Sequence, residues 1–139
     1  MRFWDSSALI PLMLDEPRSD EMRQLLAEDW TIVTSAITPI EIACVLWRKR
    51  HHDELSVPAH HEADVAFATL STRWDEVAYS SAVAEHALDV VSRQSLRSLD
   101  ALQLASAIAY AGKTAFLAFV ALDEKLRKAA RAEGFRVLP

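Results

Sequence analysis

The 139-residue sequence predicts an α/β protein in which a parallel sheet of four to five strands carries helices on both faces. Short β-branched or apolar runs alternate along the chain with longer segments that have helical spacing, the order typical of parallel sheets. One run, Thr114–Ala121, is almost continuously apolar, as expected for a strand covered on both faces. No linker-like change in composition interrupts the chain, so we expect one domain over residues 1–139.

The first half of the sequence predicts two strands and two helices, which are followed by a more polar region. Arg2–Asp5 is a short apolar run that ends in an acid, and Arg18–Asp29 carries apolar side chains at helical intervals. Trp30–Ser35 is rich in β-branched residues and predicts a strand. Thr38 followed by proline opens a helix that we expect to run to about Arg50.

The second half continues the same alternation. We expect helices at Pro58–Arg73, Ser81–Gln94, Ser98–Ala111 and Lys125–Glu133, and strands at Asp75–Tyr79, Thr114–Ala121 and Phe135–Leu138. Gly112 and Gly134 stand where two of these helices should end.

Composition excludes several classes of protein. The single cysteine, Cys44, rules out a disulfide framework and a cysteine-based zinc site, and its apolar neighbours predict that it is buried. No apolar segment has the roughly 20 residues of a membrane helix, and no secretory signal is recognisable, so we expect a cytoplasmic protein. The net charge of −5 would be unusual for a nucleic-acid-binding protein without cations in its site.

Four acids are predicted to meet at one edge of the sheet. Asp5 and Asp123 follow strands, and Glu41 and Asp100 lie in the first turns of helices. The carboxyl ends of parallel strands form the edge where such proteins bind ligands. Each acid also has a structural alternative, because Asp5 and Asp123 could cap helices and the Thr38–Glu41 segment matches a capping box.

Asp100 is the hardest of the four to explain by capping. It shares a helix face with Leu104, Ala107, Ile108 and Ala111, an apolar stripe that should face inward. A lone carboxylate is unfavourable there, and several carboxylates gathered together repel one another unless a cation lies between them. The sequence therefore indicates a site for a hard divalent cation such as Mg²⁺ or Mn²⁺.

Four segments together resemble the PIN domain, most closely the VapC-type toxins of bacterial toxin–antitoxin pairs. They are Phe3–Leu9, Ser35–Glu41, Leu99–Ala105 and Leu122–Asp123 with the residues that follow to Gly134. The resemblance covers essentially the whole chain. It implies a Mg²⁺- or Mn²⁺-dependent endoribonuclease, an RNA substrate, inhibition by a cognate antitoxin protein, and a homodimer.

The resemblance also implies roles for individual residues. Asp5, Glu41, Asp100 and Asp123 would bind metal and be catalytic, with the tighter ion on Asp5 and Asp100, and the hydroxyl of Ser7 would support them. One departure is Ala121, because the family often has Thr or Ser two positions before its last acid.

RNA contacts are expected from basic residues near the acids, above all Arg97, one turn before Asp100, and Arg48. A solvated helix face is the structural alternative for each of them. The helix Ile37–Arg50 is apolar nearly all round, so it is either fully buried or part of an interface.

Two other functions remain open. A catalytically weak PIN-like binding module would keep the fold without cleaving RNA, and Ala121 leaves room for it. A phosphoacceptor receiver domain also gathers acids at a sheet edge, but it would have paired acids after the first strand and a lysine after a late one, and neither is present. The histidine pairs His51–His52 and His60–His61 are better explained as polar connections than as a metal cluster.

Overall fold

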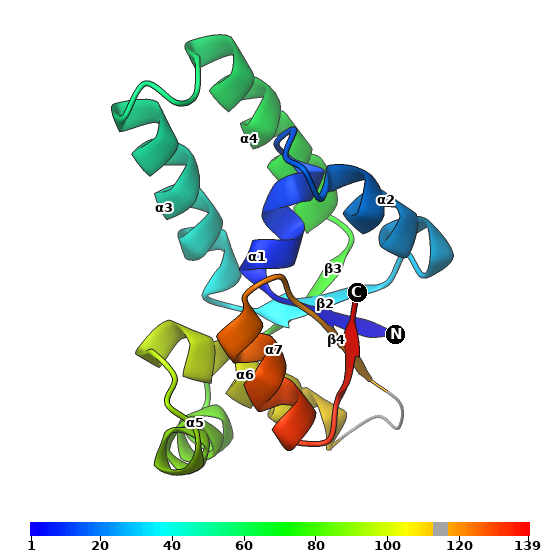
Figure 1. The fold of residues 1–139 in the computed structure, drawn as a ribbon, viewed down its shortest axis with the longest axis vertical. Helices are drawn as coiled ribbons and strands as arrows, with labels where there is room; N and C mark the ends of the chain where they lie inside the picture. Colours follow the sequence, from blue (N-terminus) through cyan, green and yellow to red (C-terminus); the bar gives the residue numbers. More distant parts are fainter. Residues whose placement is uncertain (113–116) are drawn as a thin grey trace.

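The structure is a computed structural model that describes residues 1–112 and 117–139. In these residues five parallel strands form one sheet in the order β3-β2-β1-β4-β5 (Figure 1). The strands are β1 (Arg2–Trp4), β2 (Ile32–Ser35), β3 (Trp74–Val77), β4 (Ala118–Val120) and β5 (Arg136–Leu138). The predicted fold class is confirmed; residues 114–116 of the predicted strand Thr114–Ala121 lie outside the described residues.

The helices follow the predicted order with slightly shifted ends, and α6 has the predicted bounds. They are α1 (Ser6–Leu9), α2 (Ser19–Glu28), α3 (Thr38–His51), α4 (Val57–Ser71), α5 (Ser81–Arg93), α6 (Ser98–Ala111) and α7 (Glu124–Ala132), with a 3₁₀ turn η1 at Ile10–Leu12. No bounds were predicted for α1, which was considered only as a helix that Asp5 could cap, and η1 was missed, because segments this short give no helical periodicity. No helix among the described residues is both long and apolar enough to cross a membrane.

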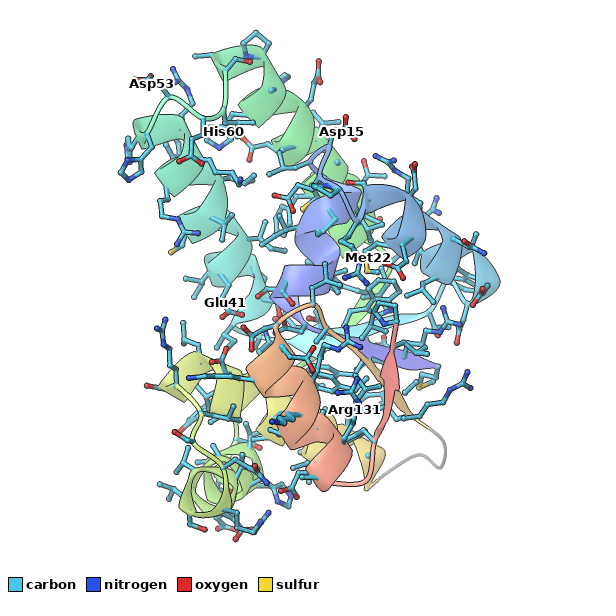
Figure 2. All side chains as sticks on the ribbon, in the orientation of Figure 1. Asp15, Met22, Glu41, Asp53, His60 and Arg131 are labelled. Atoms are coloured by element: carbon cyan, nitrogen blue, oxygen red, sulfur yellow. The ribbon has the colours of Figure 1, made fainter. Side chains whose placement is uncertain are left out.

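Side chains of successive strand residues point to opposite faces of the sheet and so divide the core in two. Phe3 and Phe119 face α5, α6 and α7, and their rings stack with centroids 5.3 Å apart. Trp4 and Val120 face the other layer, which contains α1, α2, α3 and α4. Figure 2 shows Met22 of α2 directed into this second layer. Helices therefore cover both faces, as predicted.

The strand order places β1 at the centre of the sheet and at its switch point. From β1 the chain moves to β2 and β3 on one side, and later to β4 and β5 on the other. The backbone N–H of Asp5 donates to the carbonyl of Val120 at 2.9 Å, which joins the ends of β1 and β4. In open α/β sheets the crevice at such a point is the usual ligand site.

Helix α3 has an exposed apolar face. Ile42 and Leu46 are buried against the sheet, whereas Ile40 is 66% exposed and Trp47 is 54% exposed. Cys44 lies on the same outer face and is exposed, so the prediction that it is buried was wrong. The helix has apolar residues on both faces. The apolar residues next to Cys44 in the sequence therefore do not surround it in space. Of the two predicted alternatives for this helix, full burial is excluded.

The histidines lie around the connection between α3 and α4. His51 ends α3, whereas His60 is inside α4, buried, with its ring edge-on to Trp47 at 4.6 Å. Figure 2 shows His60 facing α3. These residues help to pack the two helices, and they form no metal cluster among the described residues.

Candidate active site

Asp5 lies immediately after β1 and is held by the first turn of α1. Its carboxylate accepts the backbone N–H of Ser7 at 2.9 Å and also the Ser7 hydroxyl, so it caps α1 as the structural alternative proposed. Capping does not account for its surroundings, because the residue is only 4% exposed. Burial, with further repulsion from Glu41 and Asp100, raises its pKa to about 7 against the hydrogen bonds from Ser7 that lower it.

Ser7 connects this acid to the neighbouring strand. Its hydroxyl donates to Asp5 and accepts the backbone N–H of Leu122 at 2.9 Å. Leu122 follows β4, so one side chain fixes Asp5 relative to the segment that leads to Asp123. The Ser7 hydroxyl is therefore in direct contact with Asp5, and the supporting role in metal binding that the resemblance implies for it stays a prediction.

Glu41 lies in the first turn of α3, but the capping box predicted for it is not formed. The N-cap residue is Ile37, which has no side-chain cap, and the Thr38 hydroxyl contacts Thr34 instead. The Glu41 carboxylate accepts the side-chain amide of Gln103 at 2.5 Å. Its pKa is raised by burial and by the charge of Asp100, and is lowered in part by hydrogen bonds from Gln103 and Ser6.

Asp100 and Asp123 form the outer part of the group. Burial and the charge of Asp123 raise the pKa of the half-buried Asp100, while the Arg97 backbone amide and the charges of Arg97 and Lys125 lower it. Asp123 is exposed and caps α7, accepting the backbone N–H of Leu126 at 2.9 Å. Ala121, where the family often has a hydroxyl, is fully buried in the apolar layer beneath α7.

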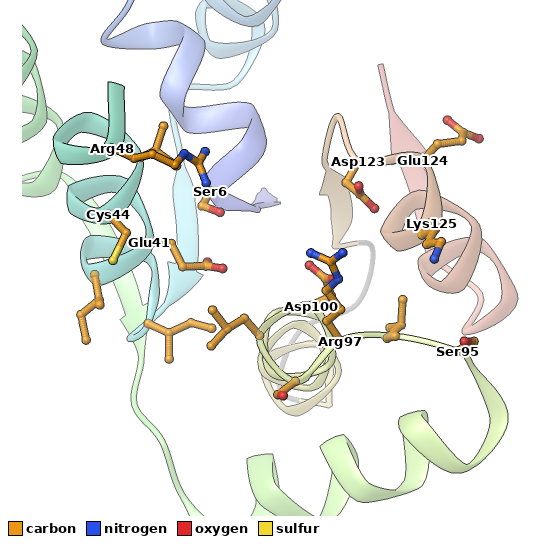
Figure 3. Close-up of a pocket in the computed structure, with 16 residues that line it drawn as sticks. Ser6, Glu41, Cys44, Arg48, Ser95, Arg97, Asp100, Asp123, Glu124 and Lys125 are labelled. Carbon is orange, nitrogen blue, oxygen red and sulfur yellow. The ribbon is translucent and has the colours of Figure 1, made fainter. Parts of the chain in front are cut away.

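A pocket of about 990 Å³ opens over these acids. Glu41, Asp100 and Asp123 line it, whereas the buried Asp5 does not. Figure 3 shows Arg48 on the α3 side and Arg97 close to Asp100 on the opposite side. Two side chains that the sequence analysis did not name also reach the acids: Ser6 and Gln103.

The carboxylates are neighbours and do not form a ready-made metal cage. Among residues 1–112 and 117–139, no three His, Cys, Asp or Glu side chains are arranged to hold one ion. The donor chemistry nevertheless fits a hard cation, because all four candidates offer only carboxylate oxygen. Asp5, which is buried beside Glu41 and Asp100, would gain most from a positive ion. Asp5, Glu41, Asp100 and Asp123 are the residues that could hold it.

The PIN domain family matches residues 2–132 of this sequence. The chain belongs to the PIN domain family. The match covers all four acids and overturns the receiver-domain alternative. A comparison with curated protein sequences gives no match.

Solved structures with the same fold include several toxin–antitoxin proteins. VapC20 of Mycobacterium tuberculosis, described as a toxin that cleaves the sarcin–ricin loop, is 22% identical with a TM-score of 0.69, over 100% of both chains. A toxin–antitoxin complex from Klebsiella pneumoniae is 23% identical with a TM-score of 0.65, over 100% of this PIN domain and 97% of that chain. VapBC2 of Rickettsia felis, bound to a DNA fragment from its promoter, is 14% identical with a TM-score of 0.68, over 99% and 96% of the chains. At these identities the likeness shows the shared PIN fold.

Proposed function

We propose that this PIN domain is a divalent-metal-dependent endoribonuclease and the toxin of a toxin–antitoxin pair. The observation that carries the proposal is the environment of Asp5: a buried carboxylate, beside Glu41 and Asp100, whose pKa is raised to about 7. A protein gains nothing in stability from gathering acids in this way. A site that binds Mg²⁺ or Mn²⁺ needs such a group of oxygen ligands.

The acids differ in what they offer to a cation. Asp5 and Asp100 would hold the tighter ion, Glu41 would assist from α3, and Asp123 would contribute to a second ion. Divalent cations in such sites activate water as a nucleophile and offset negative charge on a phosphate. Ser7 keeps the Asp5 carboxylate turned toward α1 through two hydrogen bonds, so its orientation is set before any ligand binds.

An RNA backbone is the substrate that best matches the rim of the pocket. Arg48, Arg97 and Lys125 line it, and none of the three is ion-paired within the described residues. By contrast Arg2, Arg18, Arg23 and Arg93 each contact a carboxylate. Cations that are free of carboxylate partners on both sides of an acidic pocket support binding of a phosphodiester chain across it.

Protein partners are expected as well. The PIN structures from Klebsiella pneumoniae and Rickettsia felis are described as toxin–antitoxin assemblies. This chain has exposed apolar side chains that suit protein contacts, including Ile40 and Trp47 on α3 and Leu88 on α5. We propose a cognate antitoxin and a homodimer in the cytoplasm, with RNA as the substrate of the free toxin.

Incubation of the purified protein with a panel of defined tRNA and ribosomal RNA species tests the proposal. Cleavage should require Mg²⁺ or Mn²⁺, stop in EDTA, leave a 5′-phosphate and a 3′-hydroxyl, and disappear in Asp100→Asn. Cleavage that persists in EDTA or in Asp100→Asn would contradict it. Metal binding with no cleavage of any RNA would favour the alternative of a catalytically weak PIN-like binding module.

A further inference from the structure

We propose that Gln103 is a positioning residue for the candidate active site, which holds the Glu41 carboxylate in the orientation needed to bind the divalent cation. The inference rests on the proposed function, since it assigns a task to Glu41 within that site. Gln103 lies on α6, one turn after Asp100, and is fully buried. One helix would thus supply both an acid of the site and the side chain that orients an acid of another helix.

The contacts of Gln103 form one continuous hydrogen-bonded chain. Its Nε2 donates to Glu41 Oε2 at 2.5 Å and to Thr38 Oγ1 at 2.9 Å. Thr38 Oγ1 lies 2.7 Å from Thr34 Oγ1, which in turn donates to the backbone carbonyl of Trp4 at 2.8 Å. The chain therefore runs from the end of β1, next to Asp5, through β2 to the first turn of α3.

The number of available protons fixes which group donates in each of these hydrogen bonds. The only hydroxyl proton of Thr34 is used on the Trp4 carbonyl, so the Thr38 hydroxyl must donate to Thr34. Thr38 can then only accept, as can a Glu41 carboxylate that is ionised to bind a cation, and both amide hydrogens of Gln103 are required. A rotated amide would place its oxygen against a carboxylate oxygen, which is repulsive.

This orientation of the Gln103 amide is unfavourable at one atom. Gln103 Oε1 is buried and has no hydrogen-bond partner among the described residues. An unsatisfied buried acceptor typically costs about 1–3 kcal/mol. An apolar residue at position 103 would avoid this cost in a helix whose neighbours Leu104, Ala105 and Ala107 are all fully buried. The amide instead donates one hydrogen bond to Glu41 and one to Thr38, the first residue of α3.

Fixing Glu41 matters because its carboxylate is at the end of a flexible side chain on the wall of the pocket. The Gln103 amide occupies Oε2, and Ser6 provides a further hydrogen bond, so rotation of the carboxylate is restricted. Side chains that orient the ligands of a metal ion typically change metal affinity or activity by 10–100-fold when they are removed. We expect an effect in this range for Gln103.

Mn²⁺ binding followed by electron paramagnetic resonance, with RNA cleavage measured in parallel, tests the inference. Gln103→Met keeps the length and volume of the side chain but removes both donors, and should weaken Mn²⁺ binding by about tenfold or more. Thr38→Val breaks the chain without touching Glu41 and should weaken binding less. The matched control is Ser106→Ala, which removes the buried contact of 2.9 Å between the Ser106 and Ser35 hydroxyls on the same helix and sheet. It should lower stability and leave Mn²⁺ affinity unchanged.

A double-mutant cycle separates positioning from general stability. If Gln103 acts through Glu41, Gln103→Met should have no further effect on Mn²⁺ affinity in a Glu41→Ala background. An equal loss of affinity in both backgrounds, or no loss in the wild-type background, would overturn the inference. A separate result would contradict the proposed function, namely that Asp5→Asn binds Mn²⁺ with the same affinity as the wild type.

Discussion

The buried and the exposed halves of the acid group are stabilised by different means. On the buried side, Asp5 and Glu41 accept hydrogen bonds, and the charges that act on them come from other acids of the group. On the exposed side, Asp100 has the positive charges of Arg97 and Lys125 nearby as well as the negative charge of Asp123, which caps α7. The unfavourable burial of negative charge, which a cation would offset, is therefore concentrated on the buried half, where the hydrogen bonds from Ser7 and Gln103 oppose it only in part.

Asp5→Asn should have the largest effect on cleavage. The amide keeps the shape of the side chain and can still accept the Ser7 N–H, so the fold should persist, but the charge that attracts a cation is lost. Divalent cations contribute several kcal/mol to such reactions, so we expect a loss of roughly a thousandfold or more in the cleavage rate. The measurement is the initial rate on one RNA that the wild type cuts, and a rate within tenfold of the wild type would refute the role of Asp5.

The metal-free protein should become less stable as pH rises from about 4 to about 7. The pKa of Asp5 is raised from 3.8 to about 7, so the native state keeps a proton that the unfolded chain releases. The stability associated with that proton is complete below pH 4, is lost as pH approaches 7, and changes little above. The loss is on the order of 4 kcal/mol for this residue alone.

Urea unfolding in EDTA across this pH range gives the measurement. The raised pKa values of Glu41 and Asp100 act with the same sign. Asp5→Asn is the matched variant: it should flatten the curve and be more stable than the wild type at pH 8 without metal. If the wild type instead becomes more stable between pH 4 and pH 7, the pKa of Asp5 is not raised in the native state.

Asp123 offers a way to separate capping from metal binding. Asparagine is as good an N-cap as aspartate, so Asp123→Asn should keep the hydrogen bond to Leu126 and the stability of α7. Asp123→Ala should lose about 1 kcal/mol. If Asp123 also helps to bind a cation, both variants should cleave RNA about tenfold more slowly. Full activity in Asp123→Asn would restrict this residue to its structural role.

The smallest effects are expected from substitution of the arginines on the rim of the pocket. Arg48→Ala and Arg97→Ala should each raise the KM for RNA severalfold and leave kcat nearly unchanged. Each should reduce the slope of log affinity against log salt by about one, as for a single phosphate contact. Arg18→Ala is the control, because Arg18 pairs with Glu21 on α2 away from the pocket. An equal change in the Arg18 variant would point to a general effect of net charge.

The sequence was sufficient for the architecture and for the location of the acids. The alternation of strand and helix patterns predicted a parallel sheet, and Asp5 and Asp123 follow its adjacent strands β1 and β4. The inward-facing stripe of α6 predicted the partial burial of Asp100. These features depend on local periodicity and on a general property of parallel sheets, both of which a single sequence contains.

Other features depend on contacts between distant residues and were not predictable. Gln103 is one polar residue in an apolar helix, and its contact with Glu41 spans 62 positions. The capping box at Thr38 was expected from local spacing, but a tertiary hydrogen bond to Thr34 takes its place. Cys44 was assigned to the core from its sequence neighbours, although the helix turns it toward solvent.

The central claim is that burial of the acids, together with their mutual repulsion, disfavours their ionised forms until a divalent cation binds. The effect of Mn²⁺ on the unfolding midpoint at pH 8 tests this claim most directly. The wild type should unfold at a higher temperature as Mn²⁺ is added, with a gain of about 2.7 kcal/mol at a hundred times the dissociation constant. Asp5→Asn should start from an equal or higher midpoint in EDTA and respond far less. A wild type that Mn²⁺ does not stabilise, or an Asp5→Asn variant that it stabilises equally, would contradict the account.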